Sequence, residues 1–185
     1  MNDVADINWL YNTYYKDNPE LYRIVITHSR MVARKALEIV IKKNLPLEHK
    51  EVFCAALLHD IGVVECDAPD IHAYGSLPYI QHGLAGKKIL DRHGLFTFSN
   101  ICVRHTGAGI TSKEITEHNL PLPKMDFVPR SLLEKLICYA DKFYSKSGDL
   151  KKEKDLSYIR HQMQKFGDGA LDRFNEMHSF FATDE

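Results

Sequence analysis

The sequence lacks the features that would indicate a membrane protein or a nucleic-acid-binding protein. No apolar run approaches the roughly 20 residues of a membrane-spanning helix, and the first ten residues, MNDVADINWL, contain no cationic segment followed by an apolar one. No basic tract is present, and the 24 Lys and Arg are balanced by 25 Asp and Glu, so that the formal net charge is −1. We therefore expect a cytoplasmic protein with no membrane partner and no stable nucleic-acid partner.

The four cysteines also lack a pattern that would indicate a disulfide framework or a zinc knuckle. Cys54, Cys66, Cys102 and Cys138 are far apart in the sequence, and no C-x-x-C pair occurs. Three of them lie within apolar helical patterns, where a reduced thiol behaves as a small apolar side chain. The sequence therefore predicts buried, reduced cysteines.

What the sequence does contain is a helical periodicity along almost its whole length. Apolar residues recur at spacings of three and four, and no sustained two-residue alternation is bounded by hairpin turns. The length of 185 residues and the 44% apolar content suit one domain with a sizeable core. The sequence thus predicts an all-α, single-domain protein over residues 1–185, with helices at about 4–15, 20–43, 47–60, 80–93, 97–105, 131–146 and 155–181.

Capping boxes mark two helix starts. Ser131 precedes Glu134 by three residues, and Thr111 precedes Glu114 by the same spacing, so that a hydroxyl and a carboxylate can satisfy each other's free amides.

Loops longer than about 15 residues in a compact domain are usually functional. The chain contains two such segments without a helical pattern, 63–79 and 106–130.

Polar side chains that can bind a metal fall on the inward faces of several predicted helices. His28, for example, is in line with Met31, Val32 and Ile39, so it shares the apolar stripe of its helix rather than the solvated face. The apolar run VFCAALL, from 52 to 58, leads directly into an adjacent histidine and aspartate. The same reasoning gives five helices with an inward imidazole or carboxylate: His28, His59 with Asp60 next to it, His82, His105 and Asp141.

Each histidine taken alone has an ordinary explanation. A single histidine on an apolar helix face is more often a satisfied core residue than a ligand, and with ten histidines some fall inward by chance. Asp60 and Asp141 differ, because a buried carboxylate without a partner is costly. A cation shared by the two removes that cost, and imidazoles with carboxylates suit Zn, Mn or Fe better than Ca. We therefore predict metal binding, with coincidental core histidines as the alternative.

These residues lie in segments that resemble the HD superfamily of metal-dependent phosphohydrolases. HDIG at 59–62 has the form of the motif that names the superfamily. HSRMVARKALEI resembles the helix of the first histidine, AALLHDIG the second helix, and LLEKLICYADKFYS the helix of the last aspartate. HGLAGKKIL and RHTGAGI are similar to a small HDIG group of archaea and bacteria, and RHTG and YAD also to HD-type diadenosine tetraphosphate hydrolases.

The resemblance implies a helical bundle with a metal site between its helices. It implies a metal-binding core at about 20–146, with a helical extension at 150–185. One or two divalent transition-metal ions are implied, among Fe, Mn, Zn, Co and Ni, with Mg as a further candidate. The implied ligands of one ion are His28, His59, Asp60 and Asp141, and those of the other are His82 and His105, with Asp60 bridging.

The resemblance also implies hydrolysis of a phosphate ester or anhydride in a small, nucleotide-type substrate by a metal-activated hydroxide. Asp60 would hold the reacting centre, while Lys142 and Arg104, each next to a ligand, would neutralise phosphoryl oxygens; Lys35 is a weaker candidate. Val63 follows HDIG where many relatives have a basic residue. A non-catalytic, metal-containing nucleotide-binding or regulatory module is the alternative, and a homodimer is compatible with either.

Both long loops are candidates for contacts with the substrate. Tyr74 and Tyr79 lie in the first, where they would serve as a lid or stack on a base. In the second, the glycine amides of TGAGI would hold an anion. His72 and His118 lie one in each loop, and their roles stay open.

Overall fold

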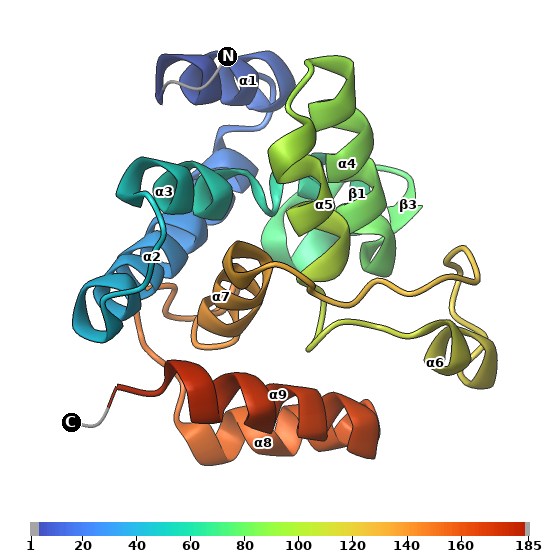
Figure 1. The fold of residues 1–185 in the computed structure, drawn as a ribbon. Coiled ribbons are helices and arrows are strands. Elements are labelled where there is room, and N and C mark those ends of the chain that lie inside the picture. Colours follow the sequence, from blue (N-terminus) through green and yellow to red (C-terminus); the bar gives the residue numbers. More distant parts are fainter. Residues whose placement is uncertain (1–3, 184–185) are drawn as a thin grey trace.

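The computed structural model describes residues 4–183, and α-helices account for most of its regular structure. α2 lies against α3 and α7, α4 pairs with α5, α8 packs against α9, and α9 packs against α7 (Figure 1). The predicted all-α class is confirmed, apart from one small sheet. The helices are α1 Val4–Tyr15, α2 Pro19–Lys43, α3 His49–Leu58, α4 His82–Arg92, α5 Phe96–Arg104, α6 Ser112–Glu117, α7 Leu132–Asp141, α8 Leu156–Lys165 and α9 Asp168–Phe181.

Local signals fix both ends of α2, the helix that carries His28. The Asn18 side chain accepts a hydrogen bond from the Leu21 amide at 3.0 Å, and Pro19 takes the first turn, where its missing N–H has no helical partner to lose. Asn44 ends the helix in the left-handed conformation at φ 48°. The helix therefore continues unbroken past His28, whose side chain is fully buried.

α7 is shorter than the predicted helix at 131–146. It begins, as predicted, with the capping box of Ser131 and Glu134, but it ends at Asp141. The residues that follow include serines and Gly148, which adopts φ 69°, and such residues favour turns over helix. The prediction of helix beyond Asp141 is therefore wrong, and the turn that replaces it brings Lys146 to the polar cluster described below.

The predicted helix at 155–181 is two helices. α8 and α9 are separated at Gly167, which adopts φ 104°, a conformation that other residues rarely take. The chain reverses there, and the two helices lie side by side (Figure 1). Both helices belong to the predicted C-terminal extension. This extension contacts α7, where the ring of Tyr139 packs against the rings of Phe174 and Phe181 of α9.

The predicted loop at 63–79 contains short ordered elements. Three strands lie in this segment, and each has only two or three residues, which is too short for an alternating pattern to show in the sequence. β1 is the central strand, antiparallel to β2 and parallel to β3. The elements are the 3₁₀ turns η1 Ile61–Glu65, η2 Pro69–Ile71 and η3 Tyr79–Gln81, and the strands β1 Cys66–Ala68, β2 Ala73–Tyr74 and β3 Leu77–Pro78.

The predicted loop at 106–130 projects from the helical body and carries α6 at its far end (Figure 1). α6 begins at the capping box of Thr111 and Glu114 that the sequence predicts. Backbone hydrogen bonds of 3.1 and 2.7 Å between Ile110 and Phe127 close the base of the loop. Its two branches are thereby held together beside α9.

A close backbone contact sets the position of α4 relative to the end of α3. A Cβ at Gly62 would lie 2.1 Å from both the Gly86 amide nitrogen and the His82 carbonyl oxygen. Only glycine permits this approach, so η1 packs directly on the backbone of α4. His82, the first residue of α4, is thereby held beside the adjacent His59 and Asp60.

Other expectations concern the cysteines and membrane segments. Each of the four cysteines is buried and outside any disulfide, which confirms the prediction. Within residues 4–183, no helix has the length and apolar character needed to cross a bilayer.

Candidate metal centre

The structure brings all six predicted metal ligands together in one buried cluster. One atom from each residue can be chosen so that the atoms of a group lie within 4.8 Å of one another. Asp60 belongs to both groups, so the two share a carboxylate. The first group is His28, His59, Asp60 and Asp141, and the second is Asp60, His82 and His105.

Helix ends supply most of this cluster. His59 and Asp60 follow the last residue of α3, His105 follows the last residue of α5, and Asp141 is the last residue of α7. His82 is the first residue of α4, whereas His28 lies within α2. Side chains at helix ends can converge while the apolar faces of the same helices pack below them. This explains how an apolar run such as VFCAALL ends in an imidazole and a carboxylate.

Backbone carbonyls orient three of the histidine rings. His59 Nδ1 lies 2.6 Å from the Ala56 carbonyl oxygen, and His82 Nδ1 lies 2.7 Å from the Tyr79 carbonyl oxygen. In His105 the distance to the Ile101 oxygen is 3.2 Å. A carbonyl only accepts, so Nδ1 carries the proton in each ring and Nε2 is directed at the cluster. This is the usual arrangement of a metal-binding histidine and its backbone partner.

The inward atoms of the imidazoles and of Asp60 face one another directly. The Nε2 atoms of His82 and His105 are 3.0 Å apart, and the Nε2 atom of His59 is 3.0 Å from an Asp60 oxygen. Both Asp60 oxygens are buried; Oδ2 forms an ion pair with the Lys146 ammonium, whereas Oδ1 has no hydrogen-bond partner in the part of the chain that the structure describes. Buried polar atoms rarely go unsatisfied. A cation among them resolves these contacts, so the residues fit a metal.

In the first group, the His28 ring contacts both carboxylates. The Nε2 atom of His28 lies 2.8 Å from Asp141 Oδ1 and 3.3 Å from Asp60 Oδ2. Its Nδ1 atom is buried and has no hydrogen-bond partner among the described residues. His28 thus bridges the two carboxylates that the sequence indicates would need a shared cation.

The charge of the carboxylates is visible in the pKa values around them. Burial alone would lower the pKa of His59, but Asp60 and Asp141 outweigh it and raise the pKa to about 9. Burial, together with the charge of His105, lowers the pKa of His82 to about 3. The cluster therefore takes up a proton at His59 when no metal is bound, and metal binding would displace that proton.

Two lysines supply the positive charge nearest the carboxylates. Lys142 Nζ lies 2.7 Å from Asp141 Oδ2 and donates to the His105 carbonyl at 3.0 Å. Lys146 Nζ lies 2.6 Å from Asp60 Oδ2. Burial would raise the pKa of both aspartates, but their basic neighbours hold each pKa well below the usual range. The sequence does not reveal Lys146, because it stands at the end of a predicted helix.

Two other predicted cations are engaged elsewhere. Arg104 Nη1 lies 2.7 Å from Glu134 Oε1, and the other oxygen of Glu134 caps the start of α7. Lys35 pairs with Glu153 and lies 4.0 Å from the centre of the Phe143 ring. The structure thus gives Arg104 and Lys35 structural partners, and a catalytic role for Arg104 stays a prediction.

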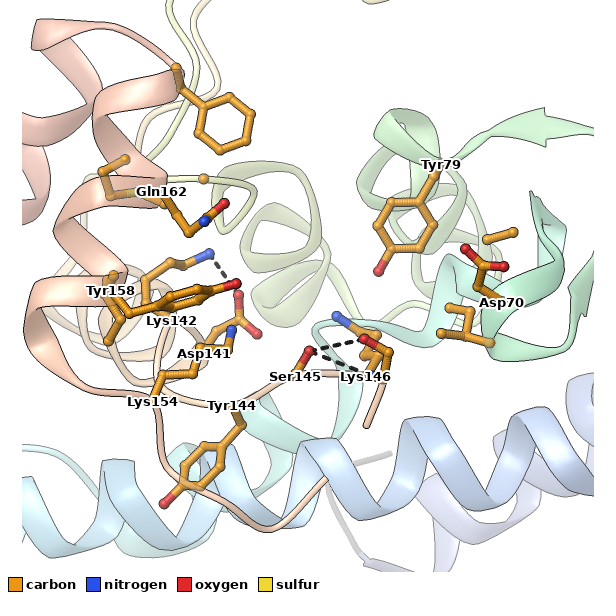
Figure 2. Close-up of a pocket in the computed structure, with 17 residues that line it drawn as sticks. Asp70, Tyr79, Asp141, Lys142, Tyr144, Ser145, Lys146, Lys154, Tyr158 and Gln162 are labelled. Atoms are coloured by element: carbon orange, nitrogen blue, oxygen red, sulfur yellow. Dashed lines mark hydrogen bonds and ion pairs between the residues drawn. The ribbon is translucent and has the colours of Figure 1, made fainter. Parts of the chain in front are cut away.

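A cavity of about 530 Å³ opens beside the first group of ligands. Asp141, Lys142 and Lys146 line it together with Lys154, so three ammonium groups border one space (Figure 2). The Tyr79 hydroxyl points into the cavity from the opposite side to Tyr158 and Gln162 of α8 (Figure 2). The cavity is therefore cationic at the cluster carboxylates, with aromatic residues on two opposite walls.

The residues predicted in the long loops take different positions. The Tyr79 ring stacks on His82 with centroids 4.9 Å apart, whereas Tyr74 is exposed and lines neither this cavity nor the apolar cavity described below. His72 is also exposed, and its carbonyl accepts a hydrogen bond from Asn18. His118 belongs to neither ligand group and lines the wall of that second cavity.

Comparisons with known proteins identify a family and several relatives. A family model described as "HD domain" matches residues 25–145. A tRNA (cytidine(56)-2'-O)-methyltransferase of Picrophilus torridus is 33% identical over 66% of this chain and 32% of its own length. One of Thermoplasma volcanium is 29% identical over 86% of this chain and 42% of its own.

A third relative carries no activity in its name. This uncharacterized protein of Methanocaldococcus jannaschii is 34% identical over 63% of this chain and 64% of its own length. The chain therefore spans less than half of each named methyltransferase and about two thirds of this protein. No solved structure matches the chain.

Proposed function

Because the chain belongs to the HD domain family, we propose that it is a metal-dependent phosphohydrolase that cleaves a phosphate ester or anhydride of a small, nucleotide-type substrate. The observation that carries this proposal is the joining of two features. A buried cluster of imidazoles and carboxylates contains inward atoms, among them His59 Nε2 and Asp60 Oδ1, that have no hydrogen-bond partner among the described residues, and a cavity lined by lysines opens at one of its carboxylates. The first suits a divalent cation and the second suits a phosphate.

The metal would be held by the six residues of the cluster. Imidazole and carboxylate ligands together favour Fe, Mn, Zn, Co or Ni, with Mg as a further candidate. Such a cation lowers the pKa of a bound water and neutralises charge on phosphoryl oxygens. Asp60 belongs to both ligand groups, so we assign it the role of joining them. Whether one or two ions bind is for elemental analysis to decide.

The lysines of the cavity would bind the phosphate and orient it. Lys142 and Lys146 already contact the cluster carboxylates at 2.7 and 2.6 Å. Each ammonium can keep one carboxylate contact and donate a second hydrogen bond into the cavity, because an ammonium group has three donors. Burial and the neighbouring lysines lower the pKa of Lys154, although the charge of Asp141 opposes them. An anion between these three groups would relieve their mutual repulsion.

The other side of the cavity supports a nucleotide-type substrate. Tyr158 offers an aromatic face for a base, Gln162 beside it offers an amide donor and acceptor, and the Tyr79 hydroxyl points in from the opposite wall (Figure 2). The volume of about 530 Å³ lies within the ~300–1,000 Å³ typical of small-molecule sites. A homodimer and the exact substrate stay predictions of the sequence.

The relatives suggest one source of substrates. Two of them are named for modifying a cytidine of tRNA, and the matched part is less than half of each. We infer that this part is the HD portion, and that nucleotides derived from RNA belong in any substrate panel. Methyl transfer itself finds no support in the ligand cluster.

A panel assay tests the proposal. Nucleoside mono- and diphosphates, cyclic nucleotides, 2'-O-methylcytidine phosphates and dinucleoside polyphosphates would be incubated with the protein and Mn²⁺ or Fe²⁺, and the products separated by chromatography. We expect turnover of at least one class, lost with a chelator and regained with metal. Tight nucleotide binding without any turnover would favour the regulatory module instead.

A further inference from the structure

A second cavity, of about 480 Å³, adjoins the cationic one. The two share Tyr79, Gly107 and Phe166 in their walls. Gly107 is two residues beyond His105, and Tyr79 stacks on His82, so the junction lies next to the second group of ligands. A molecule held at the cluster can therefore extend into either space.

Hydrocarbon covers most of the wall of this second cavity. The loop that follows His105, the turn η3 and the start of α9 contribute the apolar surface. These residues are Ile80, Ala108, Ile110, Leu120 and Ala170. The cavity thus offers dispersion contacts and burial of apolar surface to whatever occupies it.

The charged residues of the wall are already paired. Arg173 Nη2 lies 2.8 Å from Glu114 Oε1 and also donates to the Gly109 carbonyl at 2.8 Å. The other Glu114 oxygen accepts from the Thr111 amide and hydroxyl. Lys165 and His118 are exposed, which places them at the rim. The interior therefore presents few free partners for a polar ligand.

This chemistry discriminates between candidate occupants. A nucleobase has hydrogen-bonding edges, and their burial without partners is unfavourable. A hydrocarbon or phenyl group loses nothing on entry and gains burial. Phe166, at the junction, is 55% exposed, so an apolar group that passes it would also cover an aromatic ring now open to water.

We propose that the second cavity binds an apolar, hydrocarbon-like arm attached to the phosphate that the cluster and the lysines hold. This inference rests on the proposed function, since it deepens the substrate class of the same site. The substrate is then amphiphilic, with the phosphate at the metal ligands and an aliphatic or aryl group between the loop after His105 and α9. A second substituent on the phosphate, where present, occupies the cationic cavity.

Two non-hydrolysable probes test the assignment by binding alone. Phenylphosphonate and methylphosphonate carry the same anionic head and differ in the apolar arm. Titration calorimetry with the full chain and saturating Mn²⁺ would give a dissociation constant for each. We expect phenylphosphonate to bind about tenfold more tightly, as burial of part of a phenyl ring predicts. Equal affinities, or no binding of phenylphosphonate, would overturn the proposal.

A matched pair of variants locates the effect. Ala170→Leu adds bulk at a buried residue of the second cavity, and the ratio of the two affinities should fall to near one. Ala182→Leu makes the same change at the end of α9, outside both cavities, and should keep the ratio. A ratio unchanged in a folded Ala170→Leu variant would place the phenyl group elsewhere.

A second variant covers a failure of Ala170→Leu to fold. Leu120 is only partly buried, so Leu120→Asn places an amide on the cavity wall at little cost to the core, and it should reduce the preference for phenylphosphonate. The two proposals fail separately. A preference for the phenyl probe without hydrolysis in the panel would remove the enzyme and keep the cavity, and hydrolysis without that preference would do the reverse.

Discussion

Two clusters of polar side chains in this molecule differ in whether their atoms are satisfied. In the network of Arg173, Glu114 and Thr111, donors meet acceptors at 2.7–3.2 Å. In the cluster around Asp60, imidazole nitrogens and carboxylate oxygens meet one another. Apart from the ion pair between Oδ2 and Lys146, the Asp60 oxygens lack hydrogen-bond partners within residues 7–183. The first arrangement stabilises a loop. The second, incomplete by itself, marks a site that a ligand completes.

The largest expected effect breaks the incomplete cluster. Asp60→Ala removes the carboxylate shared by both ligand groups, so we expect loss of metal binding and of turnover by at least about a thousandfold, the scale of losing a catalytic electrostatic centre. Elemental analysis and the panel assay measure the two. Asp91→Asn, at a carboxylate paired with Lys87 on α4, is the control. Full metal content with full activity in Asp60→Ala would refute the assignment.

A smaller effect tests the second ligand group alone. His82→Ala removes a ligand that only this group contains. If two ions bind, protein purified without chelator should fall from about two equivalents of transition metal to about one, the behaviour expected of a two-metal site. A content near one in both proteins would reduce the site to a single ion.

The satisfied cluster should respond in stability instead of metal content. Arg173→Ala leaves a partly buried Glu114 carboxylate without its guanidinium partner, and removal of hydrogen bonds to charged groups costs about 2 kcal/mol. Urea denaturation should show this loss, while elemental analysis finds the metal content of the wild type. A loss of metal in this variant would show that the two clusters are coupled, and the contrast between them would fail.

One substitution at Lys146 should change the stability of the metal-free protein and its affinity for metal in opposite directions. Its ammonium lies 2.6 Å from Asp60 Oδ2, where it offsets the carboxylate charge and competes with a cation. In Lys146→Gln we expect the metal-free protein to lose unfolding free energy, because the fully buried Asp60 carboxylate loses its ammonium partner, while Mn²⁺ binds more tightly. Calorimetry and thermal denaturation measure these. Weaker Mn²⁺ binding would instead make Lys146 a support of the site.

The smallest effect is a dependence of the satisfied network on pH. Burial would raise the pKa of Glu114, but the Thr111 amide and Arg173 lower it overall. A carboxylate whose pKa is depressed in the folded state contributes stability above its unfolded pKa and loses it as pH falls through the folded value. The stability difference between wild type and Glu114→Gln should therefore shrink in acid below about pH 4. A constant difference would contradict the shift.

Sequence reasoning located the ligand cluster because each ligand belongs to a local pattern. His28 lies on an apolar stripe, and His59 and Asp60 end an apolar run, so their inward direction follows from helical spacing. Lys146 has no such signal. Its position depends on where α7 ends, and helix ends are the least predictable part of a pattern.

The cavities and the small sheet could not be predicted from the sequence, for a related reason. The strands have two or three residues, and the break between α8 and α9 depends on the conformation of Gly167. Each cavity is bounded by segments that are distant in the chain, including the loop after His105 and α8. Such surfaces follow from the path of the loops, for which periodicity gives no information.

Gly62 has a consequence for how the two ligand groups tolerate change. Its backbone touches that of His82 and Gly86, with no side chain between them. The spacing of Asp60 from His82 is therefore set by main chain against main chain, which rotamer changes cannot adjust. The core can repack around substitutions elsewhere without changing this backbone contact. Even a methyl group at position 62 would push α4 away and separate the two ligand groups.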